Sequence, residues 1–206
     1  MKNPALVCVT RHGETDWNVS GILQGWTDIP LNARGRAQAR ELAVSFADAG
    51  FVAVWSSPLV RSSETAAIIA AALGLPPPTL HDGLMERNFG AVQGVPKAEL
   101  AELNPLLMQQ IVARNPAARF IGGETMDECA DRVSAALHAL GRRHAGARVL
   151  MITHGWTMDV ITRQAAGLPR NAVLNLKRKN GESVWLEASR DAVRSAGDPL
   201  VVRPAR

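Results

Sequence analysis

The sequence predicts a three-layer α/β/α fold built on a mainly parallel central sheet. Three apolar runs, at residues 5–9, 51–55 and 148–152, are short and rich in β-branched side chains, as buried strands are. A stretch with helical spacing of apolar residues follows each run. Strands that alternate with helices are typical of a parallel sheet that helices cover on both faces.

We expect the 206 residues to form one domain. Hydrophobic residues make up 47% of the chain and charged residues 20%, which suits a globular protein with a large core. No stretch resembles a linker, so a single domain over residues 1–206 is predicted, with a loose tail from residue 189. No apolar segment approaches the ~20 residues that span a bilayer, and residues 1–4 lack a secretory signal. A cytoplasmic protein without membrane contact is therefore expected.

Local signals mark where the helices begin and end. Asn32 is a good N-cap, Gly50 is a stop, and Pro58 is tolerated in a first helical turn. Thr125 and Glu128 have the spacing of a capping box. The helices that we expect cover residues 33–49, 58–74, one or two segments of 97–114 broken at 104–105, 126–143 and 157–166.

Further strands are predicted between and after these helices. A short one covers residues 79–81, after a run of prolines. Residues 173–177 and 183–186 alternate around Asn180-Gly181, which is a turn signal for a β-hairpin. The sequence leaves open whether two chains pair through an apolar strand edge to form a homodimer.

The charged residues favour a small anionic ligand. The net charge is +4, but the basic residues are dispersed, and the only dense cluster, residues 177–179, is interpreted as the exposed end of a late strand. We therefore expect no nucleic-acid partner. Most of the basic residues are arginines, which bind phosphate and carboxylate through a planar fork. Cys8 and Cys129 lack metal-ligand spacing and are interpreted as small buried apolar residues.

Two histidines end two of the predicted core strands. His12 follows Arg11 and precedes Gly13, and His154 precedes the helix that begins near Thr157. The carboxyl ends of strands in an open α/β sheet form the ligand crevice. An imidazole nucleophile beside a fixed positive charge is one interpretation of His12. A strand that ends in a solvated basic turn is the other.

Two further side chains fit the same crevice. Arg61 lies in the first turn of a helix whose free N–H groups and dipole favour a phosphate. Glu86 lies between apolar residues, a setting that would raise the pKa of its carboxyl and allow it to protonate a leaving oxygen. The alternative for Glu86 is a structural salt bridge with Arg87 or a distant arginine.

Three residues between the first strand and the first helix could line the same pocket. Asn18 offers an amide donor, Gly25 offers a backbone N–H, and Gln24 lies beside Gly25. Each is also a common turn residue.

The ordered motifs resemble the histidine phosphatase superfamily, in its phosphoglycerate mutase-like branch. They cover roughly residues 5 to 165. The matching motifs are Arg11-His12-Gly13-Glu14-Thr15 with Trp17-Asn18, Gln24-Gly25, Asp28 to Asn32, Ser56-Ser57-Pro58-Leu59 with Arg61 and Thr65, Glu86-Arg87, Gly122-Gly123-Glu124, and Thr153-His154-Gly155.

The resemblance implies a phosphohistidine mechanism without a metal or cofactor. His12 would attack phosphorus, and Glu86 would protonate the leaving oxygen and then take a proton from water. The oxygens of the phosphate would be held by Arg11, Arg61, Asn18 and His154, the last as imidazolium. Gln24, Gly25, Gly155 and Lys97 would complete the phosphate and substrate contacts. Arginines supply the positive charge that a magnesium ion otherwise gives.

Departures from the mutase pattern favour a phosphatase that acts on a small phosphorylated metabolite. Phe89 stands where the mutases have a tyrosine, Trp156 where they have an asparagine, and only Arg114 remains of an arginine pair. A mutase must retain and reorient a phosphorylated intermediate, so the loss of polar clamps favours water as the acceptor. Phe89 and Trp156 indicate either a partly apolar leaving group or core packing.

Two alternatives remain. The first is a phosphoglycerate mutase, because Lys97 and Arg114 are retained, and a bisphosphoglycerate primer would activate such an enzyme. A catalytically silent protein that binds a phosphorylated ligand is the second. We assign no site role to the other three histidines, His81, His138 and His144.

Overall fold

A computed structural model describes residues 3–174 and 176–196 of the chain. Its centre is a six-stranded sheet in the order β3-β2-β4-β1-β5-β6. The strands are β1 (Ala5–Arg11), β2 (Ala53–Ser56), β3 (Thr79–Leu80), β4 (Arg148–Thr153), β5 (Ser183–Ala188) and β6 (Val193–Ser195). β1 to β4 are parallel to one another, whereas β5 pairs antiparallel with both β1 and β6. The predicted mainly parallel sheet is confirmed.

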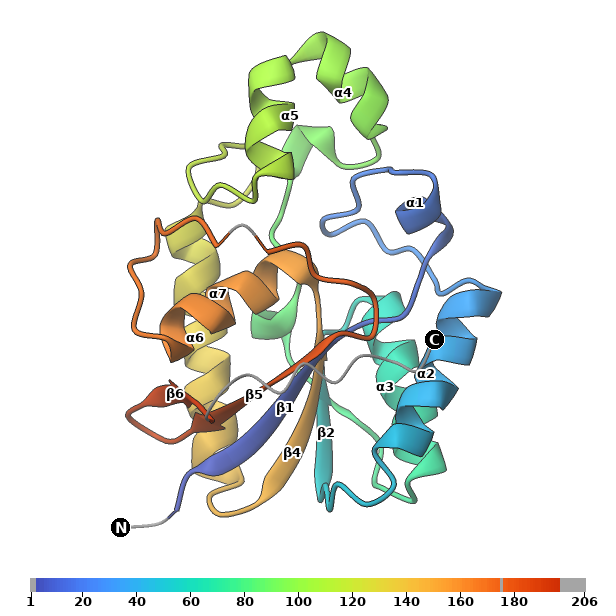
Figure 1. The fold of residues 1–206 in the computed structure, drawn as a ribbon, viewed down its shortest axis with the longest axis vertical. Helices are drawn as coiled ribbons and strands as arrows, with labels where there is room; N and C mark the ends of the chain where they lie inside the picture. The colour runs from blue at the N-terminus through green and yellow to red at the C-terminus, as the bar shows by residue number, and fades with distance from the viewer. Residues whose placement is uncertain (1–2, 175, 197–206) are drawn as a thin grey trace.

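Helices cover both faces of this sheet, so the predicted three-layer architecture is confirmed (Figure 1). α2 and α3 lie on one face and α6 and α7 on the other, while α4 and α5 project beyond the carboxyl ends of the strands. The helices are α1 (Asp16–Val19), α2 (Ala33–Ser45), α3 (Val60–Ala72), α4 (Lys97–Leu103), α5 (Pro105–Val112), α6 (Met126–Arg143) and α7 (Gly155–Ala165), with short 3-10 turns η1 (Asp82–Leu84) and η2 (Gly90–Val92).

The helix ends follow the local signals in most cases. Asn32 caps α2 by accepting from Gly35 N at 2.8 Å, and Thr125 and Glu128 form the predicted capping box of α6. Asn104 separates α4 from α5, which confirms the predicted break. Several boundaries differ: α2 ends at Ser45 rather than at residue 49, α5 ends at Val112 rather than at residue 114, and α7 begins at Gly155 rather than at residue 157. α3 spans Val60–Ala72 rather than residues 58–74, so Pro58 precedes its first turn.

Alternate residues of the central strands supply two apolar cores. Val7 and Val9 of β1 face α6 and α7, whereas Cys8 packs against α2 and α3. Cys8 and Cys129 are buried and unbridged, as expected. Among the described residues no helix is both long and apolar enough to cross a bilayer.

The predicted β-hairpin around Asn180-Gly181 is wrong. β5 pairs antiparallel with β1 and with β6, whereas residues 173–174 and 176–177 form no strand, and residue 175 lies outside the described residues. Gly181 N instead donates to Arg11 O at 3.1 Å. Pairing along the length of β1 gives β5 more backbone partners than a local hairpin would. It also gives β5 a buried face.

The expected loose tail from residue 189 is also corrected in part. Val193–Ser195 forms β6, with Leu186 of β5 opposite Ser195. Val193 is buried, so this segment closes the outer edge of the sheet. Residues 197–206 lie outside the described residues.

Candidate active site

The register between β1 and β4 brings the two predicted histidines together. These strands are adjacent and parallel, with Arg11 opposite Thr153. The residues that follow them, His12 and His154, are therefore neighbours. His12 N donates to Thr153 O at 3.0 Å, and the centroids of the two imidazole rings are 5.1 Å apart. Both rings are buried. This pairing places them at the carboxyl edge of the sheet, as predicted.

The His12 ring is oriented as a nucleophile. Its Nδ1 lies 2.6 Å from Gly13 O, which can only accept, so Nδ1 carries the proton and Nε2 keeps its lone pair. Burial lowers the pKa of His12 well below its ordinary value, and the charges of Arg61 and Arg11 lower it further. At neutral pH the ring is uncharged and able to attack.

The backbone around His12 is held by a residue that the sequence did not single out for the site. Asn180 Nδ2 donates to His12 O at 2.9 Å, to Gly13 O at 3.1 Å and to Asn18 Oδ1 at 3.2 Å. Thr65 Oγ1 accepts from Gly13 N at 3.1 Å. Asn180 had only the signature of a turn, so no local pattern could have shown this role.

Asn180→Ala should lower kcat by roughly tenfold or more, because displacement of a nucleophile by a fraction of an ångström weakens in-line attack. The substitution removes one donor from three acceptors around His12. Steady-state turnover of an aryl phosphate would measure the loss. The neighbouring exposed Lys179→Ala is the control and should keep normal kcat, and equal rates for the two variants would contradict this role of Asn180.

His154 differs from the imidazolium that the resemblance implied. Its Nε2 lies 2.8 Å from Ser57 Oγ, a hydroxyl that also accepts from Leu59 N at 3.3 Å. Its Nδ1 is buried and has no hydrogen-bond partner among the described residues. Burial, and then the charge of Arg61, lower the pKa of His154 well below its ordinary value. At neutral pH the site therefore contains two uncharged histidines.

Acid should destabilise the protein below about pH 6.5, because the folded pKa values of His12 and His154 are both lowered. The unfolded chain binds more protons there, so the free energy of unfolding falls as the pH falls, by up to about 1.4 kcal/mol per pH unit for each histidine. Above that pH both histidines are neutral in the folded and in the unfolded chain, so this loss of unfolding free energy disappears. Urea unfolding between pH 5 and pH 7.5 would measure the slope.

His154→Gln should reduce this slope, whereas His138→Gln, a change on the α6 surface, should leave it unaltered. An unchanged slope in His154→Gln would show that this imidazole does not titrate with unfolding.

Arg11 and Arg61 are anchored by backbone carbonyls. Arg11 Nη1 donates to Arg178 O at 2.5 Å, and Arg61 donates to Thr27 O at 2.9 Å and to Gly25 O at 2.7 Å. Burial lowers the pKa of each arginine to about 10, so both remain charged at neutral pH. These carbonyls orient the guanidinium groups without neutralising them, which leaves their charge available to an anion.

The amino end of α3 only partly matches its prediction. Arg61 lies in the first turn, as expected, but Val60 N donates to Asp28 Oδ1 at 2.6 Å and Leu59 N donates to Ser57 Oγ at 3.3 Å. The N–H groups of Leu59 and Val60, which the sequence predicts to face a phosphate, therefore donate to side chains of the protein instead. The contribution of α3 to the site is the Arg61 side chain.

Glu86 lies in a polar setting, which corrects the expected apolar one. Its Oε1 accepts from Arg87 N at 3.0 Å, Trp156 N at 3.1 Å and Thr157 N at 3.3 Å. The N-cap residue His154 makes no side-chain cap, so Glu86 caps α7 from 70 residues away. Oε2 has one long contact, 3.4 Å to Trp156 N, and is the oxygen free to carry a proton. No described residue forms an ion pair with Glu86.

Two other side chains hold the backbone of Glu86. Trp26 Nε1 donates to Glu86 O at 2.6 Å, and Arg132 Nη2 donates to the same oxygen at 2.8 Å. Arg132 also bonds Met85 O at 2.8 Å and pairs with Glu124 at 2.6 Å. The motif that contains Glu124 was recognised, but nothing in the sequence connected Trp26 or Arg132 with Glu86.

Phe89 and Trp156 are core residues rather than the wall of a substrate pocket. Trp156 is 2% exposed and Phe89 is 5% exposed. Their rings pack edge to face at 6.2 Å, and Phe120 adds a third ring at 6.4 Å from Trp156. The indication of an apolar leaving group therefore has no support from these two side chains.

Asn18 and Gln24, the two polar loop residues predicted to contact the ligand, differ in what their side chains bond. Asn18 Oδ1 accepts from Thr15 N at 3.2 Å within a capping box, and Asn18 lines the cavity that Arg11 also lines. Gln24 is buried, and its Nε2 donates to Thr15 Oγ1 at 2.9 Å. Asn18 thus lies at the site, whereas the donor of Gln24 is bonded within the loop.

The two predicted site glycines have packing roles. Gly25 contributes its carbonyl to Arg61 rather than an N–H to the ligand, and its φ of 53° is one that glycine adopts readily. A Cβ on Gly155 would lie 3.2 Å from both Nη1 and Nη2 of Arg114. Any larger residue at Gly155 would therefore displace that guanidinium.

Lys97 lines a cavity that reaches the site at Arg11. The cavity has a volume of about 1150 Å³ and is also lined by Asn18 and Lys177, whereas His12, Arg61, Glu86 and His154 are not among its lining residues. Burial lowers the pKa of Lys97, and the charges of Arg11, Lys177 and Arg114 lower it further. This clustering of positive charge favours an anionic substrate.

The remaining histidines form hydrogen bonds away from the His12–His154 pair. Their contacts are His81 Nδ1 with Gly83 N at 3.0 Å, His138 Nδ1 with Ser189 O at 3.1 Å, and His144 Nε2 with Trp55 Nε1 at 3.0 Å. Among the described residues no group of three or more His, Cys, Asp or Glu side chains is placed to hold a metal ion.

The model of the histidine phosphatase superfamily (branch 1) matches residues 7–196. A protein of Shigella boydii serotype 18 named probable phosphoglycerate mutase GpmB is 35% identical over 201 residues, which cover 93% of this chain and 92% of that protein.

Solved structures match over nearly the whole chain. Bacillus stearothermophilus YhfR superposes with a TM-score of 0.85 at 26% identity, covering 94% of this chain and 96% of its own. A mycobacterial glucosyl-3-phosphoglycerate phosphatase, solved with VO3, also has a TM-score of 0.85, at 23% identity, and covers 97% of this chain and 99% of its own. The last match supports the fold alone. The chain belongs to branch 1 of the histidine phosphatase superfamily.

Proposed function

We propose that the protein hydrolyses a small phosphomonoester through a phosphohistidine on His12. Membership of the histidine phosphatase superfamily supports a phosphoric monoester hydrolase. One observation carries the finer proposal: the bond from His12 Nδ1 to Gly13 O leaves Nε2 unprotonated, close to two arginines and a second histidine. A neutral imidazole in that setting is suited to attack a phosphate.

The first half-reaction transfers the phosphoryl group to the enzyme. A bond forms from His12 Nε2 to phosphorus while the ester oxygen leaves, and Glu86 Oε2 gives its proton to that oxygen. Arg11 and Arg61 hold the other phosphate oxygens. At a spacing of ~4 Å and an effective dielectric of about 20, each charge supplies on the order of 4 kcal/mol of gross Coulomb attraction. Only the part that grows in the transition state speeds the reaction.

The second half-reaction returns the enzyme to its starting state. Water attacks phosphorus, the bond from phosphorus to Nε2 breaks, and Glu86 takes a proton from the water. Inorganic phosphate then leaves. An incoming phosphate dianion is also the counter-charge that would favour a proton on His154, the form that the unliganded site disfavours.

The alternative is a phosphoglycerate mutase. The GpmB relatives carry that name, and Lys97, on which the alternative depends, lines the same cavity as Arg11. Against it, Arg114 is already paired with Asp159 at 2.7 Å, which occupies part of the guanidinium that a mutase would need to reorient its substrate. We therefore favour water as the acceptor.

Phosphate release from a panel of phosphomonoesters in the presence of a chelator tests the proposal. The panel includes 3-phosphoglycerate and an aryl phosphate, with His12→Ala alongside. Chelator-resistant release that His12→Ala eliminates is expected. Isomerisation of 3-phosphoglycerate that needs a bisphosphoglycerate primer would favour the mutase, and binding without release or isomerisation would favour a silent phospho-ligand protein.

A further inference from the structure

A half-exposed tryptophan bonds the backbone of the residue that we assign as proton donor. Trp26 lies in the segment between α1 and α2, is 38% exposed, and belongs to neither apolar core. Its indole Nε1 donates to Glu86 O at 2.6 Å, across 60 residues of sequence. Indole has one polar hydrogen, and here it is directed at an active-site residue. Burial of apolar surface therefore does not account for the placement of Trp26.

The bond from Trp26 reaches the Glu86 carboxylate through one peptide group. Glu86 O and Arg87 N belong to the same peptide, which is rigid and planar. A donor that fixes the direction of the oxygen therefore fixes the direction of the N–H as well. Arg87 N donates to Glu86 Oε1 at 3.0 Å, so the peptide that Trp26 holds by its oxygen orients the carboxylate by its N–H. Oε2, which would carry the proton, turns with Oε1.

Trp26 is itself held in place. Its backbone N donates to Gln93 Oε1 at 2.6 Å, and the same oxygen accepts from Phe89 N at 3.3 Å. The indole therefore cannot swing away from Glu86 without breaking a second bond. Arg132 Nη2 of α6 is the other donor to Glu86 O, at 2.8 Å. The oxygen of this peptide is thus fixed both by α6 and by the segment that contains Trp26.

The residues on either side of Trp26 bind the arginine that we assign to the phosphate. Gly25 O accepts from Arg61 Nη2 at 2.7 Å, and Thr27 O accepts from Arg61 Nη1 at 2.9 Å. Three consecutive residues thus contact both Arg61 and Glu86. Protonation of a leaving oxygen needs the acid at a fixed distance from the bound phosphate. One short segment that holds both groups would fix that distance.

We propose that Trp26 is a positioning residue for the proton donor. Its indole N–H fixes the peptide between Glu86 and Arg87, and this peptide holds the Glu86 carboxylate towards a phosphate on Arg61. The inference rests on the proposed function, since it deepens the role of Glu86 in that reaction. Trp26 transfers no proton and acts only through Glu86. Its contribution should therefore appear only where proton transfer to the leaving oxygen limits the rate.

Trp26→Phe tests this role, because it removes the indole N–H and keeps an aromatic ring. It should lower kcat for alkyl phosphates by roughly three- to tenfold, which is the value of one hydrogen bond. An aryl phosphate with an acidic leaving group should lose less than about twofold, because it leaves without a proton. In the Glu86→Gln background, Trp26→Phe should add less than about twofold for any ester, since no proton remains to be placed.

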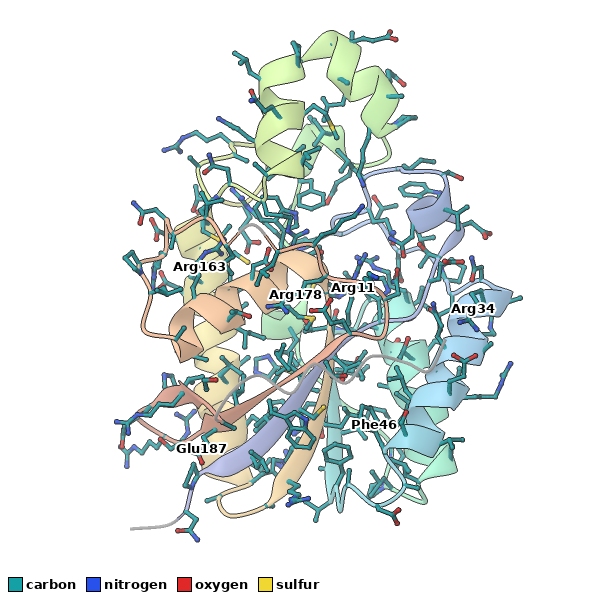
Figure 2. All side chains as sticks on the ribbon, in the orientation of Figure 1. Arg11, Arg34, Phe46, Arg163, Arg178 and Glu187 are labelled. Carbon is teal, nitrogen blue, oxygen red and sulfur yellow. The ribbon has the colours of Figure 1, made fainter. Side chains whose placement is uncertain are left out.

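Trp185→Phe is the control, since it changes the same type of side chain away from the acid. Trp185 of β5 is half-buried, and its ring stacks on Phe51 with ring centroids 5.7 Å apart. Phe51 packs edge to face on Phe46, and Figure 2 shows Phe46 below Arg11, towards the amino ends of the parallel strands. The control should keep the normal rates for both kinds of ester.

Hydrogen exchange of the Arg87 amide measures the same contact without turnover. This N–H bonds Glu86 Oε1, and its protection depends on how firmly the peptide is held. Exchange should be roughly three- to tenfold faster in Trp26→Phe and unchanged in Trp185→Phe. If Trp26→Phe does not fold, Gln93→Ala, which frees the backbone of Trp26, carries both comparisons.

Three outcomes would overturn the proposal: an equal loss for alkyl and aryl phosphates in Trp26→Phe, the same loss in the Glu86→Gln background, or unchanged exchange of the Arg87 amide. Failure of the proposed function has a different signature, in which no ester releases phosphate or His12→Ala keeps its release. The exchange measurement needs no turnover, so in that case it still decides whether Trp26 holds the Glu86 peptide.

Discussion

His12→Ala is expected to lower phosphate release by roughly four orders of magnitude or more, because removal of a covalent nucleophile removes the pathway rather than one contact. The neighbouring imidazole of His154 does not replace it, because its Nε2 is engaged with Ser57 Oγ at 2.8 Å. Release of phosphate from an aryl ester would measure the loss. Chemical quench with labelled substrate should show acid-labile phosphoprotein in the unmodified enzyme and none in the variant.

The control for this prediction is His138→Ala, which removes a histidine of α6 that bonds Ser189 O and lies outside the constellation. It should keep full activity. Turnover by His12→Ala at more than a few per cent of the normal rate, with a normal unfolding midpoint, would remove His12 from the nucleophile role.

Glu86→Gln should slow hydrolysis of poor leaving groups by roughly 10²–10⁴-fold, the range that general acid catalysis contributes. The amide is isosteric, and its oxygen can keep the three backbone donors that Oε1 now accepts. Its NH₂ group would occupy the place of Oε2, which has one long contact at 3.4 Å. The fold and the cap of α7 should therefore persist while the transferable proton is lost.

A series of aryl and alkyl phosphates would check this prediction. An aryl oxygen with a low pKa leaves without a proton, so the loss should be smallest there and should grow as the leaving group becomes more basic. Glu64→Gln, which breaks the ion pair with Arg36 at 2.6 Å, is the matched control and should not change that slope. An equal loss across the series would show that Glu86 is not the proton donor.

The sequence alone predicted most of the helices and strands correctly. Strand runs, the caps at Asn32 and Thr125, and the break at Asn104 depend on interactions within a few residues, so they can be deduced locally. The positions of His12 and His154 at strand ends were deduced in the same way. Each of these conclusions depended only on residues that lie within one or two helical turns of one another along the sequence.

Only the tertiary structure decided how these residues act on one another. The register of β1 against β4 sets the distance between the histidine rings, and the carboxylate of Glu86 is held by the amino end of α7. Asn180 keeps its local turn, closed by Glu182 N to Lys179 O at 3.1 Å, but its side chain also bonds the distant His12 backbone, and Asp159 gained arginine partners from distant segments. Contacts between residues far apart in the chain depend on the packing of whole elements, and a single sequence carries no local signal of them.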